Sequence, residues 1–175
     1  MHLPPSPRCL VLLALAVLAA CGGEDEPESP PLPPGVEALP AGARIAMPPA
    51  REHRCQPPSM RDVFREAPEW NGYWSFGLPE GCPRPELPAG FDFAREMVVF
   101  VSMGPRSSPV DSISIVGSGV VNDSVVVYVR RTTRQNGCPT EKAEVYPRDL
   151  ARIPADTLPV KFLEEHRKLP CAAGP

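Results

Sequence analysis

Hydrophobic and polar positions divide the chain into an irregular front part and a back part with the pattern of β-strands. Residues 97–101 are a continuous apolar run, which is typical of a central strand covered on both faces. Apolar side chains recur at every second position in residues 113–115 and again in residues 125–129. This alternation predicts two further strands. Between them, residues 121–124 read Val-Asn-Asp-Ser, and asparagine and aspartate tolerate positive φ. We therefore expect a β-hairpin.

Shorter apolar segments predict more strands at 143–146, 150–153 and 160–163. The run Gly117-Ser118-Gly119 indicates a bulge in the first arm of the hairpin. None of the 26 prolines falls between Val110 and Cys138, which is expected of the hydrogen-bonded centre of a sheet. The predicted fold class is mostly β (α+β), an antiparallel sandwich or partial barrel with a short N-terminal helix, preceded by a disordered proline-rich tether.

The short helix is predicted just before the strands. Ser59 is a suitable N-cap, with Asp62 three residues later. Positions 60, 63, 64 and 67 then lie on one helical face, and Pro68 should end or kink the helix.

An aromatic cluster follows, containing Trp70, Tyr73 and Trp74. Its spacing favours another helical turn, although Asn71-Gly72 would also suit a hairpin turn. Aromatic side chains at helical spacing are typical of a core. On an open face, the same rings could instead stack on a sugar, and Trp70 and Trp74 are candidate binding residues for that reason.

The first residues have the form of an export signal. Arg8 precedes an unbroken apolar run at 9–20, too short to span a bilayer but suited to a signal peptide. Leu18-Ala19-Ala20-Cys21 resembles the lipobox of bacterial lipoproteins, which implies acylation of Cys21 and membrane anchoring. The alternative is an ordinary secretory signal. Because Gly22 and Gly23 directly follow Cys21, with no aspartate at these two positions, the resemblance favours the outer membrane, facing the periplasm.

Residues 22–50 contain eight prolines, an acidic cluster and no aromatic side chain. Such a segment buries too little apolar surface to fold alone, so we interpret it as a tether. A proline-rich ligand for a partner domain is the alternative. The predicted division of the chain is a signal peptide at 1–20, a lipidated cysteine and linker at 21–54, and a β-rich domain at 55–175.

Four cysteines remain after the signal and the lipid attachment site are removed: Cys55, Cys82, Cys138 and Cys171. In an exported chain they predict two disulfides, with three connectivities open. Because Cys55 and Cys171 bracket the folded region, we favour Cys55–Cys171 with Cys82–Cys138. A zinc site that includes His53 is the alternative, but no ligand spacing supports it.

Charge and motifs exclude several function classes. A net charge of −3 argues against a non-specific nucleic-acid binder. The sequence has no HExxH, GxSxG, P-loop or GxGxxG motif, so we expect neither catalysis nor a cofactor. His166 lies in the charged stretch 164–168, where a solvated side chain is the simplest interpretation.

Basic side chains recur at the end of the predicted hairpin and beyond it. Arg130, Arg131 and Arg134 are candidate binding residues, and they could form a basic stripe with Lys142, Arg148 and Arg152. Such a stripe would receive an acidic partner surface. Charges that are simply solvated are the alternative.

Several short motifs follow one another in order between residues 87 and 163. They are Leu87–Phe93, Ala94–Phe100, Met103–Arg106, the apolar 125–129, Asn136-Gly137-Cys138, Tyr146-Pro147, Ala151–Pro154 and Pro159–Phe162. This order resembles the C-terminal domain of the PrcB family, named for a protease complex subunit. The resemblance implies an envelope lipoprotein domain that helps to assemble or stabilise exported proteases. One departure is Ser107–Asp111, where the family usually has a threonine-glycine-glycine-tyrosine loop.

The sequence therefore predicts a lipid-anchored accessory protein of the bacterial cell envelope without catalysis. Its expected partners are the membrane, through the lipid, and an exported protease or other envelope protein, bound through strand edges, loops or the basic stripe. The alternative is a module that binds envelope glycan or a small molecule through Trp70, Tyr73 and Trp74.

Overall fold

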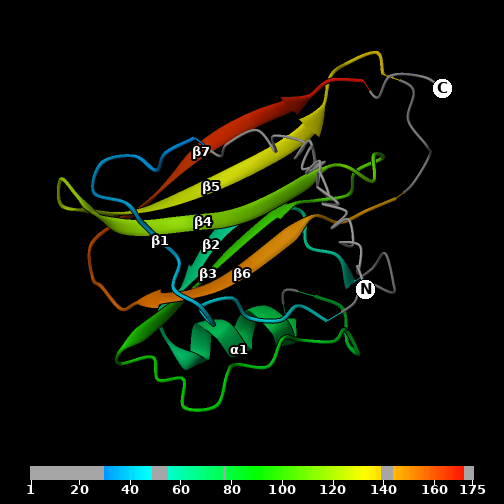
Figure 1. Ribbon diagram of the computed structural model, residues 1–175. Helices are drawn as coiled ribbons and strands as arrows, with labels where there is room; N and C mark the ends of the chain where they lie inside the picture. The colour runs from blue at the N-terminus through cyan, green and yellow to red at the C-terminus, as the bar shows by residue number, and fades with distance from the viewer. Residues whose placement is uncertain (1–29, 49–54, 77, 139–143, 172–175) are drawn as a thin grey trace, which may run out of the picture. The chain divides into compact units, whose positions relative to one another are not determined.

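The chain folds as a sandwich of two β-sheets. The computed structural model describes residues 30–48, 55–76, 78–138 and 144–171. In this part of the chain the strands form two sheets packed face to face (Figure 1). The predicted sandwich is confirmed, and no closed barrel forms among these strands.

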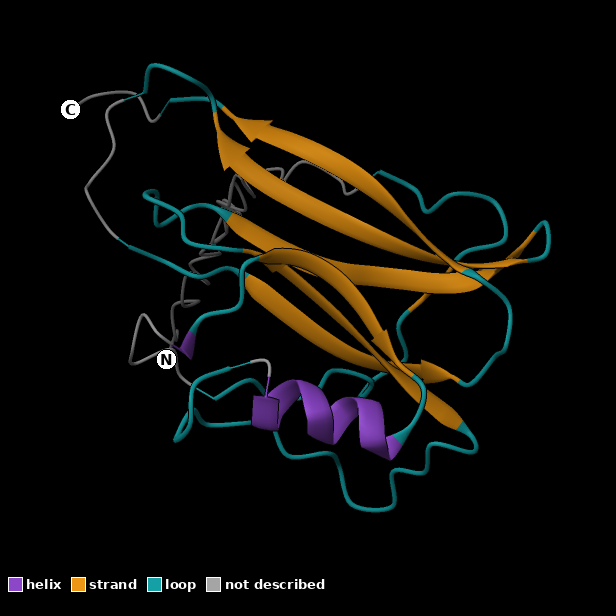
Figure 2. Ribbon diagram, turned by 180° about the vertical axis from the view of Figure 1, so that it is seen from behind, coloured by secondary structure: helices purple, strands orange, loops and turns teal. Residues whose placement is uncertain are grey.

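The two sheets differ in size and in their neighbours. The larger sheet has the order β1-β4-β5-β7 and consists of β1 (Glu37–Ala38), β4 (Ser112–Val121), β5 (Ser124–Arg134) and β7 (Val160–Leu169). The smaller sheet has the order β2-β3-β6 and consists of β2 (Ser59–Phe64), β3 (Glu96–Met103) and β6 (Arg148–Pro154). The helix α1 (Ala67–Phe76) covers the face of the smaller sheet that points away from the larger one (Figure 2).

The strand β3 lies at the centre of this arrangement, as its continuous apolar run predicts. Its side chains enter two different cores. Met97, Val99 and Val101 pack between the two sheets. Val98 and Phe100 pack on the other face, against α1. A strand that is covered on both faces needs no polar alternation, which is why this pattern was informative.

The predicted hairpin is also confirmed. β4 and β5 pair in antiparallel register, and the turn residues Asn122 and Asp123 have φ values of 46° and 55°. Two consecutive positive φ values are typical of a type I′ turn, which matches the twist of the flanking strands. The first arm does contain a register shift, but it lies between Ile115 and Gly117, just before the predicted run Gly117-Ser118-Gly119, which pairs regularly with β5. There the Asp149 carboxylate accepts a hydrogen bond from the Ile115 amide at 2.8 Å.

One strand pair departs from the antiparallel pattern. β7 pairs with β5 in parallel, with Val125 opposite Val160 and Arg134 opposite Leu169. The chain leaves β5, forms β6 in the other sheet, and returns to β5 as β7. The predicted strand at 150–153 is the core of β6, and the one at 160–163 begins β7. The strand predicted at 143–146 does not form among the described residues 144–146, because Val145 makes only an isolated bridge to Arg106.

The predicted helix at 60–67 is wrong, and the helix at the aromatic cluster is right. Residues 59–64 form β2, in which Val63 faces the core between the sheets and Phe64 faces α1. Six residues with both faces partly buried fit helical and strand periods equally well. Pro68 begins α1 instead of ending a helix, because the first turn needs no amide donor there. The hairpin alternative at Asn71-Gly72 is excluded.

The sandwich begins earlier in the chain than predicted. Residues 36–45, which we assigned to the linker, run along both sheets. β1 pairs with β4, and Arg44 bridges to Ala151 of β6. Val36, Ala43 and Ile45 are buried, and this apolar surface is sufficient to anchor a proline-rich segment. The predicted signal peptide and the acidic first part of the predicted linker lie outside the described residues.

Two disulfides form, as predicted, but with a different connectivity. Cys55 is bonded to Cys82, and Cys138 to Cys171. The predicted pairs Cys55–Cys171 and Cys82–Cys138 are therefore wrong. The parallel register explains the second bond, because β5 and β7 end side by side and Cys138 and Cys171 follow shortly after. The first bond links the segment before β2 to the segment after α1.

Candidate functional site

The aromatic cluster is part of the core. The Trp70 and Trp74 side chains are only 3% and 5% exposed. Their rings meet edge to face with centroids 5.4 Å apart, and Tyr73 packs against Trp74 at 5.0 Å. Burial, together with the nearby Asp62 carboxylate, raises the pKa of Tyr73 to about 12. The two tryptophans therefore offer no open face on which a sugar could stack.

The predicted basic stripe does not form a single surface. Arg130 and Arg131 are consecutive on β5, so their side chains lie on opposite faces of the larger sheet. Arg130 pairs with Glu165 on the outer face, with Nε 2.8 Å from the carboxylate. Arg148 and Arg152 belong to β6 in the other sheet. Lys142 lies outside the described residues.

Arg131 and Arg134 instead contribute to a polar pocket, which we call the cationic pocket. It has a volume of about 430 Å³ and lies where β5 and β7 end, next to the segment that follows β3. Its lining includes four cationic side chains and one carboxylate: Arg106, Arg131, Arg134, Lys168 and Asp111. Cys138, which forms one of the disulfides, also lines the pocket.

Some of the polar groups at the cationic pocket are paired within the fold. Arg106 Nε donates to the Asp111 carboxylate at 2.7 Å, and Asp111 is buried. The amide of Arg106 also bonds to the carbonyl of Val145 at 2.8 Å, which fixes this segment. The Thr133 hydroxyl lies 2.7 Å from Nε2 of His166. These contacts hold the walls of the pocket in place.

Other polar groups there have no partner. Among the described residues, the buried atoms Arg131 Nε and Ser108 Oγ make no hydrogen bond. A buried polar group without a partner is costly, by about 1–3 kcal/mol. The two residues to which these atoms belong both line the cationic pocket. The pocket therefore has cationic side chains in its lining, together with hydrogen-bonding capacity at Arg131 and Ser108 that the fold itself does not use. This combination suits a carboxylate or another oxyanion.

The outer face of the larger sheet carries a separate network of hydrogen bonds centred on Glu165. Its carboxylate accepts hydrogen bonds from Arg130, Arg167 and Tyr128 at 2.8, 2.7 and 3.1 Å. Burial alone would raise the pKa of Glu165, but the bonds from these neighbours outweigh it and lower that pKa. Burial and the bond to Glu165 raise the pKa of Tyr128. This network joins β7 to β5.

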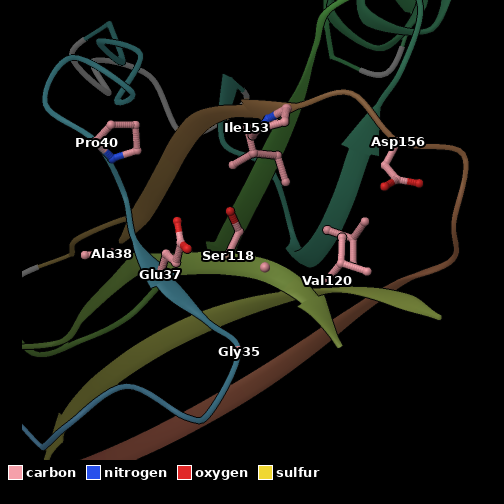
Figure 3. Close-up of a pocket in the computed structure, with 11 residues that line it drawn as sticks. Gly35, Glu37, Ala38, Pro40, Ser118, Val120, Ile153 and Asp156 are labelled. Carbon is pink, nitrogen blue, oxygen red and sulfur yellow. The ribbon is translucent and has the colours of Figure 1, made fainter. Parts of the chain in front are cut away.

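A second, larger pocket lies near the β4–β5 hairpin turn. It has a volume of about 510 Å³ and is lined by β1, β4, the start of β5 and the end of β6 (Figure 3). Its charged lining is acidic, from Glu37 and Asp156. The rest is mostly small and apolar and includes Val120, which is 58% exposed. This pocket holds no cluster of groups suited to chemistry.

The sequence indicated only part of the cationic pocket. Arg131 and Arg134 were candidates, and His166 was interpreted as solvated. Arg106, Ser108, Asp111 and Lys168 were not recognised as site residues. The charged stretch at 164–168 was a visible signal, but its relation to Arg131 depends on the parallel pairing of β5 and β7.

Two searches of the described residues bear on other kinds of site. No group of three or more histidine, cysteine, aspartate or glutamate side chains there could hold a metal ion. His53 lies outside the described ranges. No described helix is both long and apolar enough to cross a membrane.

Comparison of the chain with family models, with curated proteins and with solved structures finds no match.

Proposed function

We propose that this chain is a lipid-anchored protein of the bacterial cell envelope that binds another exported protein and catalyses no reaction. Its partner would present an acidic group, such as a side-chain or terminal carboxylate, to the cationic pocket. The single observation that carries this proposal is the pocket itself. Four cationic side chains line it, together with one carboxylate, that of Asp111, which is paired with Arg106.

The features that support an exported protein are independent of the pocket. The lipobox-like segment ending at Cys21 supports anchoring through acyl chains. The two disulfides support an oxidising compartment, because such bonds are rare in the cytosol. Proline-rich residues separate Cys21 from the sandwich, and such a spacer would let the domain reach a partner away from the lipid surface.

The resemblance to the PrcB family suggests an exported protease as the partner. Its motifs fall on the walls of the cationic pocket, because Arg106 and the turn 136–138 both line it. The segment Ser107–Asp111, where this chain departs from the family, forms another wall. We therefore propose that the partner is also an exported protease. At the wall formed by Ser107–Asp111, its contact with this chain would differ from the contact made in the family.

The glycan-binding alternative loses its basis. It required Trp70 and Trp74 on an open face, and both are buried. We do not propose it further.

Affinity purification of the lipidated full chain from its own envelope, after mild cross-linking, tests the binding function. We expect an exported protein to co-purify, and we expect R131A/R134A to recover about tenfold less of it. R95A is the matched control, because Arg95 is an exposed cation remote from the cationic pocket. Recovery should also fall as salt is raised. Equal recovery with R131A/R134A and the wild type would contradict the role of the pocket, and no partner at all would contradict the function.

Cell fractionation tests the anchor separately. C21S should move the protein from the membrane fraction to the soluble fraction of the envelope, because it lacks the thiol that carries the lipid. Retention of C21S in the membrane would contradict lipidation, whatever the outcome for the partner.

A further inference from the structure

The edge of the larger sheet formed by β7 is the longest edge strand that the sandwich leaves open. β7 has ten residues and pairs with β5 on one side. On its other side, no strand among the described residues pairs with it. An open strand of this length is a template for another strand unless its side chains forbid pairing. Its side chains therefore decide what it can pair with.

The backbone direction shows which residues of β7 present hydrogen-bonding groups at this edge. The carbonyls of Pro159 and Leu169 accept bonds from Val125 and Gln135, on the β5 side. Backbone groups alternate in direction along a strand, so the odd-numbered residues of β7 face β5. The amides and carbonyls of Glu164, His166 and Lys168 therefore point outward, away from the sheet.

The sequence of β7 is complementary to itself about His166. Antiparallel pairing of two identical strands across a two-fold axis places residues at equal distances from the centre opposite each other. With His166 at the centre, Glu165 faces Arg167 of the second copy, and Glu164 faces Lys168. Leu163 then faces Leu169. These two leucines are 46% and 39% exposed, and they belong to the exposed large hydrophobic residues of the described chain.

We propose that two copies of this chain associate through antiparallel pairing of their β7 strands, centred on His166, so that their larger sheets become continuous. In this register each oppositely charged pair lies on the same face of the sheet, as directly opposite residues of antiparallel strands must. The outward groups of Glu164, His166 and Lys168 supply the hydrogen bonds. Pro170, which has no amide hydrogen, falls at the end of the paired segment.

The neighbouring registers are disfavoured by charge. Moving the centre to Glu165 places two Glu165 carboxylates opposite each other. Moving it to Arg167 places two guanidinium groups opposite each other. A shift of one residue between the two strands would place side chains from different faces of the sheet opposite each other, because side chains alternate along a strand. The charges that protect this edge from other strands thus select one register for a second copy.

Pairs of charge variants test this interface without depending on the function proposed above. E164K should repel Lys168 of a second copy, and K168E should repel Glu164. In a mixture of the two variants, both contacts become attractive again. We expect each variant alone to associate about tenfold more weakly than the wild type or worse. We expect the mixture to form a heterodimer at close to wild-type strength.

The experiment uses the full chain, co-expressed as two differently tagged copies and purified in mild detergent from whichever cell fraction contains it. Co-purification of one tag with the other measures association, and size-exclusion chromatography with light scattering gives the stoichiometry. K161E is the matched control, because it makes the same charge change on β7 outside the paired segment, and it should leave association unchanged. Melting temperatures show whether E164K, which loses the ion pair with Arg61, remains folded.

L163D provides a second variant on the opposite face of the strand, should E164K unfold. It should also weaken association, because it removes the contact with Leu169 of the second copy. A monomeric wild-type protein would overturn the proposal. So would wild-type association by folded K168E, or failure of the folded E164K and K168E variants to associate when mixed.

Discussion

The two long sides of the sandwich are closed in different ways. On one side, residues 36–45 bond through their backbone to both sheets, pairing with β4 and with β6. On the other side, β2 and β7 are connected by side chains. Arg61 pairs with Glu164 at 2.5 Å, and the Arg65 guanidinium donates to the carbonyls of Asp156 and Leu158. One side is thus covered by main chain, and the other is left with an open strand.

This difference explains residues that look unrelated in the sequence. The covered side needs space for the main chain that crosses it, and Gly117 and Gly119 provide that space. A Cβ added at these positions would lie 2.3 and 2.0 Å from the carbonyl oxygens of Glu37 and Gly35. The open side needs charge to prevent unwanted pairing, and β7 provides it. The edge that is covered by main chain is therefore rich in glycine, and the edge that is left open is rich in charged side chains.

Removing the Cys138–Cys171 bond should have the largest effect on the open side. In C138S/C171S, β7 is no longer tied covalently to β5 next to the cationic pocket. The closed loop spans 33 residues, for which chain entropy predicts a loss of about 3–4 kcal/mol in the free energy of unfolding. Urea denaturation measures it. An unchanged midpoint would mean that strand pairing alone holds β7 in place.

Replacing a glycine on the covered side with alanine should have the next largest effect on the free energy of unfolding. G119A places a methyl group where the Gly35 carbonyl oxygen lies, so residues 35–38 must move. We expect a loss of about 2–3 kcal/mol in the free energy of unfolding. G72A is the control, because a Cβ there meets nothing within 4 Å, and alanine is the better helix former. Equal stability of the two variants would show that the N-terminal segment adds little.

Neutralising Glu165 should have a smaller effect that depends on pH. Because hydrogen bonds lower the pKa of this carboxyl in the folded protein, its contribution is present above the unfolded value of about 4.5 and is lost as the pH falls through the folded pKa. E165Q should lower the free energy of unfolding by about 1–2 kcal/mol at pH 7. Denaturation curves at pH 7, 5 and 3 should show this difference becoming smaller as the pH falls below 4.5. E86Q, at an exposed position, should show no difference, and a pH-independent deficit for E165Q would argue against the network.

The sequence predicted the local features of the fold well and the long-range ones poorly. β3 and the β4–β5 hairpin were predictable, because a run such as Val98–Val101 and a turn such as Asn122-Asp123 specify their structure within a few residues. β2 was not, since Met60, Val63 and Phe64 fit two periods. The parallel partner of β7 was not predictable either, because alternation identifies a strand but says nothing about its neighbour.

The same limit applies to the cationic pocket. Arg131 and Arg134 were recognisable as candidates because they are close in sequence. Lys168 and Ser108 join them only through the return of β7 to β5 and the course of the segment after β3. Arg130 was grouped with them, although strand alternation turns it to the face opposite to that of Arg131 and into the Glu165 network.

The order of the disulfides has a consequence for how the protein matures. Both bonds join cysteines that follow one another along the chain, Cys55 with Cys82 and Cys138 with Cys171. In the export that we propose, which starts from the N-terminus, each pair could therefore be oxidised as soon as its second thiol emerges. Sequential oxidation by a simple dithiol oxidase would give the native connectivity without reshuffling by an isomerase. Cys138, however, must wait for Cys171, so a truncation that removes Cys171 would leave a free thiol beside the cationic pocket.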